Sequence, residues 1–332
     1  MIPMIDDDLI AARVIARERV ACDVISLRLV SDAPDLPLPA FEAGAHIDLH
    51  LRDGLTRKYS LCNDPFERGV YEIAIKREPA SRGGSAHMHD AVRVGDVLRI
   101  GAPLNYFPLA PDGSPAVLLA AGIGVTPLLA MAHSLIRAGR PLALHYFVRS
   151  DDAAAYRPTL ASRLADVATV HTGLTPDATG DAIAAIVGAM DARAHLYFCG
   201  PAPFMAAVDA IARPALGDVR LHHEYFSAPI AGEAAGAGDA GGEAGAFRIE
   251  LARSQRVLLV PPGQSITDVL FDHDIPIATS CEAGICGACR TAVLAGTPDH
   301  RDAFLSAAEK GRNDCMMPCV SRCRGERLVL DL

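Results

Sequence analysis

The sequence lacks the features that mark nucleic-acid-binding, secreted and membrane-spanning proteins. It has no excess of basic residues, since its net charge is −9, and the binding of nucleic acid phosphates needs a concentrated basic surface. Its first eight residues contain neither the basic nor the apolar part of a secretory signal. The longest apolar stretch, residues 116–132, is interrupted by two glycines and a proline, so it is a poor candidate for a membrane span. We therefore expect a cytoplasmic protein that binds neither nucleic acid nor membranes, and we expect it to be a monomer.

An even set of cysteines, as in a disulfide framework, is also missing. The chain has nine cysteines and no secretory leader, which indicates a reducing compartment. Its 332 residues, half of them hydrophobic, are enough for two or three domains with cores of their own.

Four cysteines near the C-terminus have the spacing of a plant-type 2Fe–2S site. They follow the pattern C-x4-C-x2-C-x29-C, in which four thiolates hold two irons, at positions Cys281, Cys286, Cys289 and Cys319. Glycines between the first three allow the backbone to curl around a cluster and to aim amides at its sulfurs. A structural zinc site usually shows two short pairs of cysteine or histidine, and inert buried thiols need no such spacing. The pattern therefore favours the cluster over both alternatives.

The fourth ligand has two competitors. Cys315 and Cys323 stand four residues to either side of Cys319, and position alone allows either of them. The spacing favours Cys319, which precedes a predicted last strand at residues 327–332.

A low-complexity segment sets the cysteine-rich part apart. Residues 231–246 consist mainly of Gly and Ala and contain no aromatic or β-branched residue, so we interpret residues 229–246 as a flexible linker. Residues 247–332 then form a domain of their own. Strand patterns at 247–252, 257–260, 291–294 and 327–332, with a helix capped by Ser265, predict an α+β ferredoxin-like (β-grasp) domain.

The sequence before the linker divides near residue 108. Residues 1–108 contain short, partly alternating runs between turn residues, which predict an antiparallel β-barrel, with strands at 23–30, 45–51, 58–62, 70–77 and 96–100. In residues 109–228 strands alternate with helices, which predicts an α/β domain with a parallel sheet of the nucleotide-binding kind. Its strands are expected at 116–121, 142–148 and 195–198, and its helices at 126–137, 182–190 and 204–212.

Two motifs lie at the ends of predicted strands in the α/β domain. In AGIGVTP at 121–127, Gly122 and Gly124 allow the backbone to approach a pyrophosphate. The full three-glycine fingerprint is missing, so this turn alone is equally compatible with an ordinary strand-to-helix connection. CGP at 199–201 ends a later strand and leaves Cys199 at the carboxyl edge, where open α/β sheets bind ligands.

The barrel domain carries two motifs suited to a phosphate and a flat ring. In RKYSLCN at 57–63, Arg57 can hold a phosphate and Tyr59 can lie along an apolar ring. The period of a strand places both side chains on one face. GGS at 83–85 offers amides and a hydroxyl to an anion. Taken singly, a solvated strand and a common turn explain these residues as well.

Taken in order, these motifs resemble those of the phthalate dioxygenase reductase family, which includes vanillate O-demethylase reductases. The set comprises RKYSLCN, IKRE at 75–78, GGS, AGIGVTP, CGP and the cysteine pattern, and it covers nearly the whole chain. The resemblance implies an FMN-binding barrel, an NADH-binding domain and a C-terminal 2Fe–2S domain. It also implies that electrons pass from NADH through FMN and the cluster to a separate Rieske-type oxygenase that attacks aromatic acids. Such a relay requires no catalytic acid, base or nucleophile, and we assign none.

The resemblance also implies roles for individual residues. Arg57, Tyr59 and Ser60 would contact FMN, with Ser60 near the reactive ring nitrogen. Further cofactor contacts are expected at Lys76, Gly83, Gly84, Ser85, Gly122, Gly124, Thr126, Cys199 and Gly200. Phe226, in EYF at 224–226, would lie close to the flavin. Two features depart from the family pattern: Ala121 replaces a glycine that is common in the nucleotide turn, and the linker is unusually long.

The choice of nucleotide depends on the segment after the second strand of the α/β domain. Arg149 can favour the 2′-phosphate of NADPH, whereas the carboxylate of Asp151 opposes a phosphate and accepts ribose hydroxyls. Because a second aspartate follows, the segment favours NADH.

Two other functions stay open from the sequence. One is a free-standing reductase that serves small acceptors or a diiron hydroxylase. The other is a non-enzymatic electron-transfer protein that binds no flavin, which the combination of Arg57, Ser60 and the glycines at 83–84 argues against.

Overall fold

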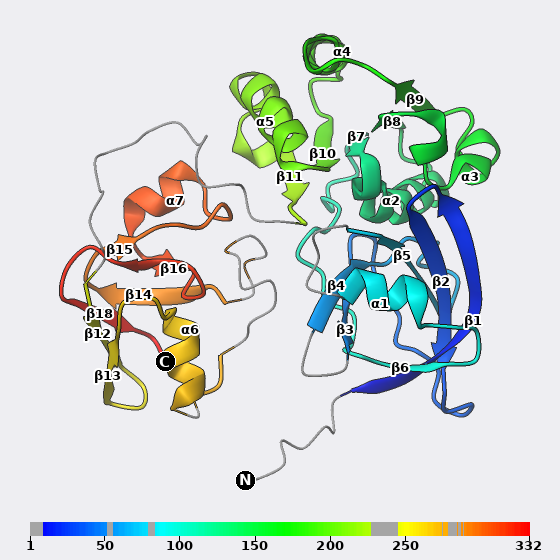
Figure 1. Ribbon diagram of the computed structural model, residues 1–332. Helices are drawn as coiled ribbons and strands as arrows, with labels where there is room; N and C mark the ends of the chain where they lie inside the picture. Colours follow the sequence, from blue (N-terminus) through cyan, green and yellow to red (C-terminus); the bar gives the residue numbers. More distant parts are fainter. Residues whose placement is uncertain are drawn as a thin grey trace. The chain divides into compact units, whose positions relative to one another are not determined.

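The computed structural model describes residues 9–51, 56–78, 84–226, 245–273, 275–277, 284, 287 and 289–332. The chain forms two compact units, Met1–Glu224 and Tyr225–Leu332 (Figure 1). The boundaries expected after residues 108, 228 and 246 stay predictions, and most of the expected linker, 229–246, lies outside the described residues. Within the described ranges, none of the helices combines the length and the apolar character that crossing a membrane requires.

The first part of the first unit is a six-stranded antiparallel sheet in the order β4-β3-β6-β1-β2-β5. Its strands are β1 (Ile10–Ala21), β2 (Val24–Ser31), β3 (His46–His50), β4 (Thr56–Ser60), β5 (Val70–Lys76) and β6 (Val97–Ile100). A bridge between Leu61, which follows β4, and Ile73 in β5 joins the two edges. The sheet therefore closes into the predicted barrel. The short helix α1 (Gly84–Asp90) buries Met88 in the barrel core.

The second part of this unit is a five-stranded parallel sheet in the order β11-β10-β7-β8-β9. The strands are β7 (Ala116–Ala121), β8 (Leu142–Val148), β9 (Ala168–Thr172), β10 (His195–Cys199) and β11 (Leu221–Glu224). Helices α2 (Val125–Arg137) and α3 (Arg157–Ala161) pack on the face of Tyr146 and Tyr197. Helices α4 (Pro176–Gly188) and α5 (Ala202–Leu216) lie on the other face, where Phe147 meets Phe204 (Figure 1). The predicted parallel α/β sheet is confirmed.

A single core connects the barrel to the parallel sheet. Ala43, Cys62 and Phe107 from the barrel part are buried with Met131 of α2 and Tyr146 of β8. Because the two parts share this apolar core, the barrel and the carboxyl edge of the parallel sheet are packed in one position relative to each other.

The second unit is a mixed five-stranded sheet crossed by a helix, as predicted for a ferredoxin-like fold. Its order is β13-β12-β18-β14-β16, in which only β12 and β18 run parallel. The strands are β12 (Phe247–Leu251), β13 (Arg256–Val260), β14 (Thr291–Ala295), β16 (Cys315–Met316) and β18 (Arg327–Leu330), with a separate pair β15 (Pro298–Asp299) and β17 (Arg322–Cys323). Helix α6 (Ile266–Asp272) begins at the predicted cap, where Ser265 and Asp268 form a capping box. A short helix, α7 (Ala307–Arg312), precedes β16.

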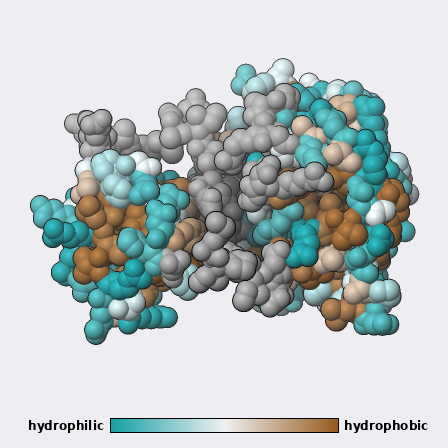
Figure 2. Space-filling model, turned by 60° about the horizontal axis from the view of Figure 1, so that its bottom comes forward, coloured by the Kyte–Doolittle hydropathy of each residue, from teal (hydrophilic) through white to brown (hydrophobic). Residues whose placement is uncertain are grey.

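Apolar side chains also reach the surface of the second unit. Val257 and Leu259 project outward from the edge strand β13, and Leu294 does so from β14. Figure 2 shows hydrophobic residues among hydrophilic ones on both units. On β13 these two side chains alternate with the buried Leu258 and Val260, so they belong to the outer face of the sheet.

Candidate functional site

The parallel sheet brings most of the predicted nucleotide residues to its carboxyl edge. Gly122 and Gly124 follow β7, and Arg149 and Asp151 follow β8. Cys199 is the last residue of β10, where it pairs with Ala120 on one side and with Glu224 of β11 on the other. This is the edge at which open parallel sheets bind nucleotides.

Two of the predicted glycines are required by close packing at this edge. A Cβ atom on Gly124 would lie 2.2 Å from the carbonyl oxygen of Cys199. A Cβ atom on Gly200 would lie 2.8 Å from Cβ of Ala121. Gly122 has a φ of +53°, a conformation that glycine adopts without steric cost. Packing within the protein therefore explains Gly124 and Gly200, and the contact of this turn with a pyrophosphate stays a prediction.

The polar side chains at this edge already have partners within the protein. The hydroxyl of Thr126 donates to the carbonyl of Ile123 at 3.0 Å, so it stabilises the turn. Asp151 accepts a hydrogen bond from Thr172 Oγ1 at 3.2 Å and pairs with Arg157 at 3.1 Å. Arg149 is exposed beside it. Asp151 therefore has polar partners within the protein although its side chain is largely exposed, and its contact with a ribose stays a prediction.

In the barrel, Arg57 lies over the start of α1. A Cβ atom on Gly84 would be 3.0 Å from Nε of Arg57, so the absence of a side chain at Gly84 lets the guanidinium lie close to the helix. Ser85, the next residue, is buried, and its hydroxyl accepts from the backbone amide of Glu78 at 3.1 Å. Arg57 thus lies beside Gly84 of the GGS motif, and a phosphate site at this place stays a prediction, since Gly83 itself lies outside the described residues.

The register of β4 separates its side chains into two sets. Arg57 pairs with Leu49 and Tyr59 pairs with Ile47, so both share one face of the strand, as predicted. Burial raises the pKa of Tyr59 to about 12, and the phenol stays neutral. Lys76 ends β5, where its ammonium pairs with Glu78 at 2.8 Å.

The opposite face of β4 takes part in a polar network that the sequence interpretation did not assign. Ser60 Oγ donates to Glu224 Oε2 at 3.2 Å, and Nδ1 of His46 lies 4.0 Å from Glu224 Oε1. Lys58 Nζ donates to Nε2 of His46 at 3.1 Å. Three of these residues come from the barrel, and the fourth ends the last parallel strand, so the network connects the predicted flavin strand to the nucleotide edge.

Burial controls the protonation of this network. It raises the pKa of the Glu224 carboxyl to about 7, against the opposing effects of the Ser60 hydrogen bond and the Lys58 charge. Burial, assisted by Lys58, lowers the pKa of His46 to about 3. Burial also raises the pKa of Cys199, with a contribution from Glu224. Near neutral pH, Glu224 can therefore hold or release a proton beside Ser60, whereas His46 and Cys199 stay neutral.

The position of Glu224 offered a signal for this network. It directly precedes Tyr225 and Phe226 in the EYF motif, and it ends a strand at the carboxyl edge. A mostly buried acidic residue in that place is typical of a functional site. Phe226 is partly exposed at the start of the second unit, so its predicted place near the flavin stays a prediction.

In the second unit, the structure brings together the two predicted cluster ligands that it describes. Sγ of Cys289 and Sγ of Cys319 lie 3.3 Å apart, and both residues are buried. Cys281 and Cys286 lie outside the described residues. The alternative ligands have other surroundings: Cys315 pairs with Ala292 within the sheet, and Sγ of Cys323 accepts from the amide of Gly325. Two adjacent buried sulfurs from distant segments fit a site where thiolates share a metal centre.

The glycines of the three-cysteine loop are packed against later segments of the chain. Gly284 and Gly287 have φ values of +70° and +76°. A Cβ atom would lie 2.5 Å from Cγ2 of Val320 at the first and 2.3 Å from the ring of Phe304 at the second. The loop therefore requires glycine at both positions, because a side chain would be strained by the backbone conformation and would overlap these neighbours.

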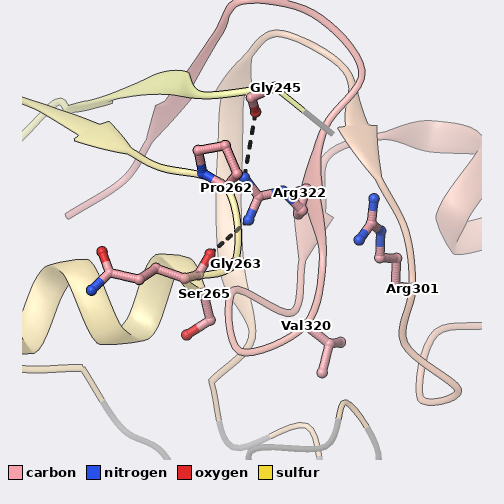
Figure 3. A pocket seen from close by; sticks show the side chains of 8 residues that line it. Gly245, Pro262, Gly263, Ser265, Arg301, Val320 and Arg322 are labelled. Carbon is pink, nitrogen blue, oxygen red and sulfur yellow. Dashed lines mark hydrogen bonds between the residues drawn. The ribbon is translucent and has the colours of Figure 1, made fainter. Parts of the chain in front are cut away.

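A cavity of about 630 Å³ opens beside this region. Figure 3 shows Arg322 at its centre, with its guanidinium donating to the carbonyls of Gln264 and Gly245 at 2.6 and 3.4 Å. Arg301 and Val320 form another part of the wall. Because Val320 follows Cys319 and touches the cluster loop at Gly284, the cavity adjoins the predicted cluster site.

Comparison with known proteins gives the family. Residues 11–108 match the model described as an oxidoreductase FAD-binding domain, and residues 249–324 match the model of a 2Fe–2S iron–sulfur cluster binding domain. A vanillate O-demethylase oxidoreductase of Pseudomonas sp. (strain HR199 / DSM 7063) is 42% identical over 319 residues, which are 96% of this chain and 98% of the relative.

Two solved structures extend the likeness to the fold. Phthalate dioxygenase reductase, described as a modular structure for electron transfer from pyridine nucleotides to [2Fe–2S], matches with a TM-score of 0.70 and 34% identity over 98% of this chain and 99% of that chain. An intact type IV self-sufficient cytochrome P450 monooxygenase matches with a TM-score of 0.81 and 31% identity, over 98% of this chain and 41% of that chain.

These matches confirm the predicted fold class and the predicted kinds of cofactor, a flavin, a 2Fe–2S cluster and a pyridine nucleotide. They also exclude the flavin-free alternative, because the barrel matches a flavin-binding model. The chain belongs to the phthalate dioxygenase reductase family, and it is an oxidoreductase that passes electrons from a pyridine nucleotide through a flavin to a 2Fe–2S cluster.

Proposed function

We propose that this chain is the reductase component of a two-component Rieske-type oxygenase or demethylase that attacks aromatic substrates, with FMN as its flavin and NADH as its donor. The observation that carries the proposal is similarity over nearly the full length to a vanillate O-demethylase oxidoreductase. The chain works as a cytoplasmic monomer in this proposal.

The flavin site is built from the two edges that meet in the first unit. Arg57 and the start of α1 would hold the flavin phosphate, because the guanidinium lies over Gly84. Ser60 and Glu224 would face the ring, where the Ser60 hydroxyl is held by the carboxyl at 3.2 Å. When bound, a flavin takes two electrons at once from a reduced nicotinamide and gives them up singly to an iron–sulfur centre, which accepts one at a time.

The protein itself contributes binding, orientation and protonation. The Gly122–Gly124 turn would admit the nucleotide pyrophosphate, and Gly124 brings it against the end of β10. Cys199 would limit water at this edge, since it is fully buried beside Glu224. Glu224 would hold a proton at its carboxyl oxygen near neutral pH.

NADH as the donor is supported by the position of Asp151. Its carboxylate contacts Thr172 and Arg157 at the carboxyl edge after β8. A carboxylate there would accept the ribose hydroxyls of NADH and repel the 2′-phosphate of NADPH. Steady-state turnover with the two nucleotides tests this, and a preference for NADPH would contradict the role given to Asp151.

FMN is expected because the barrel motifs resemble those of the phthalate dioxygenase reductase family. In this proposal Arg57 and the GGS motif bind the single phosphate of FMN. Chromatography of the flavin released from denatured protein distinguishes FMN from FAD. Recovery of FAD would agree with the description of the matching family model and would contradict our choice.

The acceptor is tested with purified oxygenases. With NADH and this reductase, a Rieske-type oxygenase should consume oxygen and convert an aromatic acid in proportion to the NADH oxidised. A second candidate acceptor, a haem monooxygenase, is favoured by one observation, the similar module in a self-sufficient cytochrome P450. Coupled turnover with a haem enzyme or a diiron hydroxylase, but with no Rieske oxygenase, would overturn the proposal.

A further inference from the structure

One segment connects the two parts of the chain that carry the predicted cluster ligands. The segment runs from Asp299, at the end of β15, to Leu305. On one side, the amide of Ala303 donates to the carbonyl of Gly284 in the three-cysteine loop at 3.0 Å. On the other side, the amide of Arg301 donates to Oγ of Ser321, two residues after Cys319, at 3.2 Å.

Asp302 lies at the centre of this segment and is completely buried. Its side chain has no exposed surface, and Oδ2 accepts from the amide of Leu305 at 2.8 Å. Oδ1 accepts from the hydroxyl of Ser321 at 3.3 Å. The ammonium of Lys310 lies 3.9 Å from Oδ2, and Nδ1 of His300 lies 3.6 Å from Oδ1. A carboxylate this deeply buried is costly unless it is paired and hydrogen-bonded. These partners explain how the fold tolerates the buried carboxylate, but they do not explain why an aspartate occupies this position.

The packing places Asp302 against the loop itself. A Cβ atom on Gly284 would lie 3.0 Å from Cα and 3.1 Å from Cβ of Asp302. Phe304, two residues later, meets the backbone of Gly287 in the same way. Figure 3 shows the neighbours Arg301 and Val320 on adjacent segments beside the cavity. The carboxylate thus lies between the three-cysteine loop and the segment that follows Cys319.

We propose that Asp302 is a positioning residue that holds Cys319 against the three-cysteine loop and keeps the reduction potential of the cluster low. Reduction adds one electron, and therefore one negative charge, to the cluster. A fixed carboxylate in a water-excluded place opposes that added charge, and groups outside the ligand set are known to orient metal ligands and to tune metal centres. Lys310 is the nearby cation, and its charge raises the reduction potential of the cluster.

The first test is the variant Asp302→Asn, which keeps the shape of the side chain and removes its charge. Anaerobic redox titration of the full chain, followed by EPR, should show the equilibrium constant for cluster reduction raised about tenfold, which is 59 mV for a one-electron couple. The iron content should stay at the wild-type value. Asp299→Asn is the matched control, since this carboxylate belongs to the same segment but is partly exposed, and it should leave the potential unchanged.

The second test separates tuning from folding. Lys310→Met removes the cation near Asp302 from a partly exposed position, so it should shift the potential in the opposite direction to Asp302→Asn. Asp302→Ala, which removes both hydrogen bonds, should lose iron or broaden the EPR signal. Unchanged potentials in Asp302→Asn and Lys310→Met, or shifts of the same sign, would overturn the electrostatic part. Full iron and a wild-type EPR signal in Asp302→Ala would overturn the positioning part.

This inference rests on the cluster assignment but not on the identity of the acceptor. If the wild-type chain contains no iron and sulfide, the proposed function fails with it. If the wild-type cluster is present and the Asp302 and Lys310 variants behave like the Asp299 control, only the role of Asp302 fails.

Discussion

The hydroxyl of Ser60 donates to the carboxyl of Glu224 across 164 positions of the sequence, at 3.2 Å. Ser60 ends a barrel strand, and Glu224 ends the last strand of the parallel sheet. This bond therefore joins the strand predicted to contact the flavin to the edge predicted to bind the nucleotide. The buried partner is a titratable group, which makes the junction sensitive to pH.

Glu224 should make the stability of the protein fall as the pH rises. Its pKa is raised from 4.5 to about 7 by burial, so between these values the folded chain binds more protons than the unfolded chain. The stability contribution is complete below pH 4.5 and is lost as the pH rises to 7. Glu224→Gln is neutral at every pH. Compared with this variant, the free energy of unfolding of the wild type should fall by up to about 3 kcal/mol between pH 4.5 and pH 8.

Urea unfolding at pH 5 and pH 8 measures this difference. Glu18→Gln is a suitable control, because Glu18 is exposed on β1, and its difference from the wild type should not change with pH. An equal effect of Glu224→Gln at both pH values would show that the carboxyl does not titrate in this range.

Gly124 should not tolerate a methyl group. A Cβ atom there would lie 2.2 Å from the carbonyl oxygen of Cys199, so the nucleotide turn would have to move away from β10. Gly124→Ala should cost roughly 1–3 kcal/mol of stability and should raise the KM for the nucleotide. Thermal unfolding and NADH-dependent dye reduction measure the two effects.

Gly180, inside helix α4, provides the contrast. Nothing lies within 4 Å of a Cβ atom at this position, and alanine in a helix interior is favoured over glycine by roughly 0.5–1 kcal/mol. Gly180→Ala should therefore raise the stability slightly and leave the KM unchanged. Equal behaviour of the two alanine variants would contradict the close approach at Gly124.

Arg57 should be needed to retain the flavin. Lysine keeps the charge but loses the planar, two-pronged hydrogen bonding that suits a phosphate. Arg57→Lys should raise the dissociation constant of the flavin about tenfold, which corresponds to ~1.4 kcal/mol. Fluorescence titration of apoprotein with FMN gives this constant. Arg68→Lys, an exposed change on the same barrel, should bind FMN like the wild type, and a tenfold loss there would indicate a general charge effect.

Strands with a continuous apolar pattern were predictable from the sequence, and a strand with an interrupted alternation was not. Strands β7 (Ala116–Ala121) and β8 (Leu142–Val148) have the predicted bounds, because buried parallel strands are continuous apolar runs. The twelve-residue β1 was not predicted, since register shifts after Val14 and Arg19 break its alternation. Helix α4 starts at Pro176, ahead of the predicted residue 182, because the side chain of Thr175 caps it.

The site was predictable where local motifs carry it. The sequence singled out Arg57, Gly84, Gly124 and Cys199 one by one, and the structure places Arg57 beside Gly84 and Gly124 beside Cys199. Their contacts with cofactors stay predictions. The network of His46, Lys58 and Glu224 was missed because each residue alone is an ordinary polar residue of a strand. The network forms only where strands from two sheets meet. These strands are far apart in the sequence, so the contact cannot be predicted from local patterns.

The pairing of Cys289 with Cys319 leads to the sharpest test of the cluster. Sγ atoms 3.3 Å apart favour Cys319 as the predicted fourth ligand over Cys315, which is equally buried four residues earlier but belongs to strand β16. Cys319→Ser should lose most of the iron and abolish electron transfer to a protein acceptor. NADH-dependent reduction of a dye at the flavin should continue, because the residues predicted to bind the flavin and most of those predicted to bind the nucleotide belong to the other unit. Cys286→Ser should behave in the same way, whereas Cys315→Ser should retain its iron. Iron analysis and the two reductase assays on the same preparations decide the matter, and iron loss in Cys315→Ser with retention in Cys319→Ser would reverse the assignment.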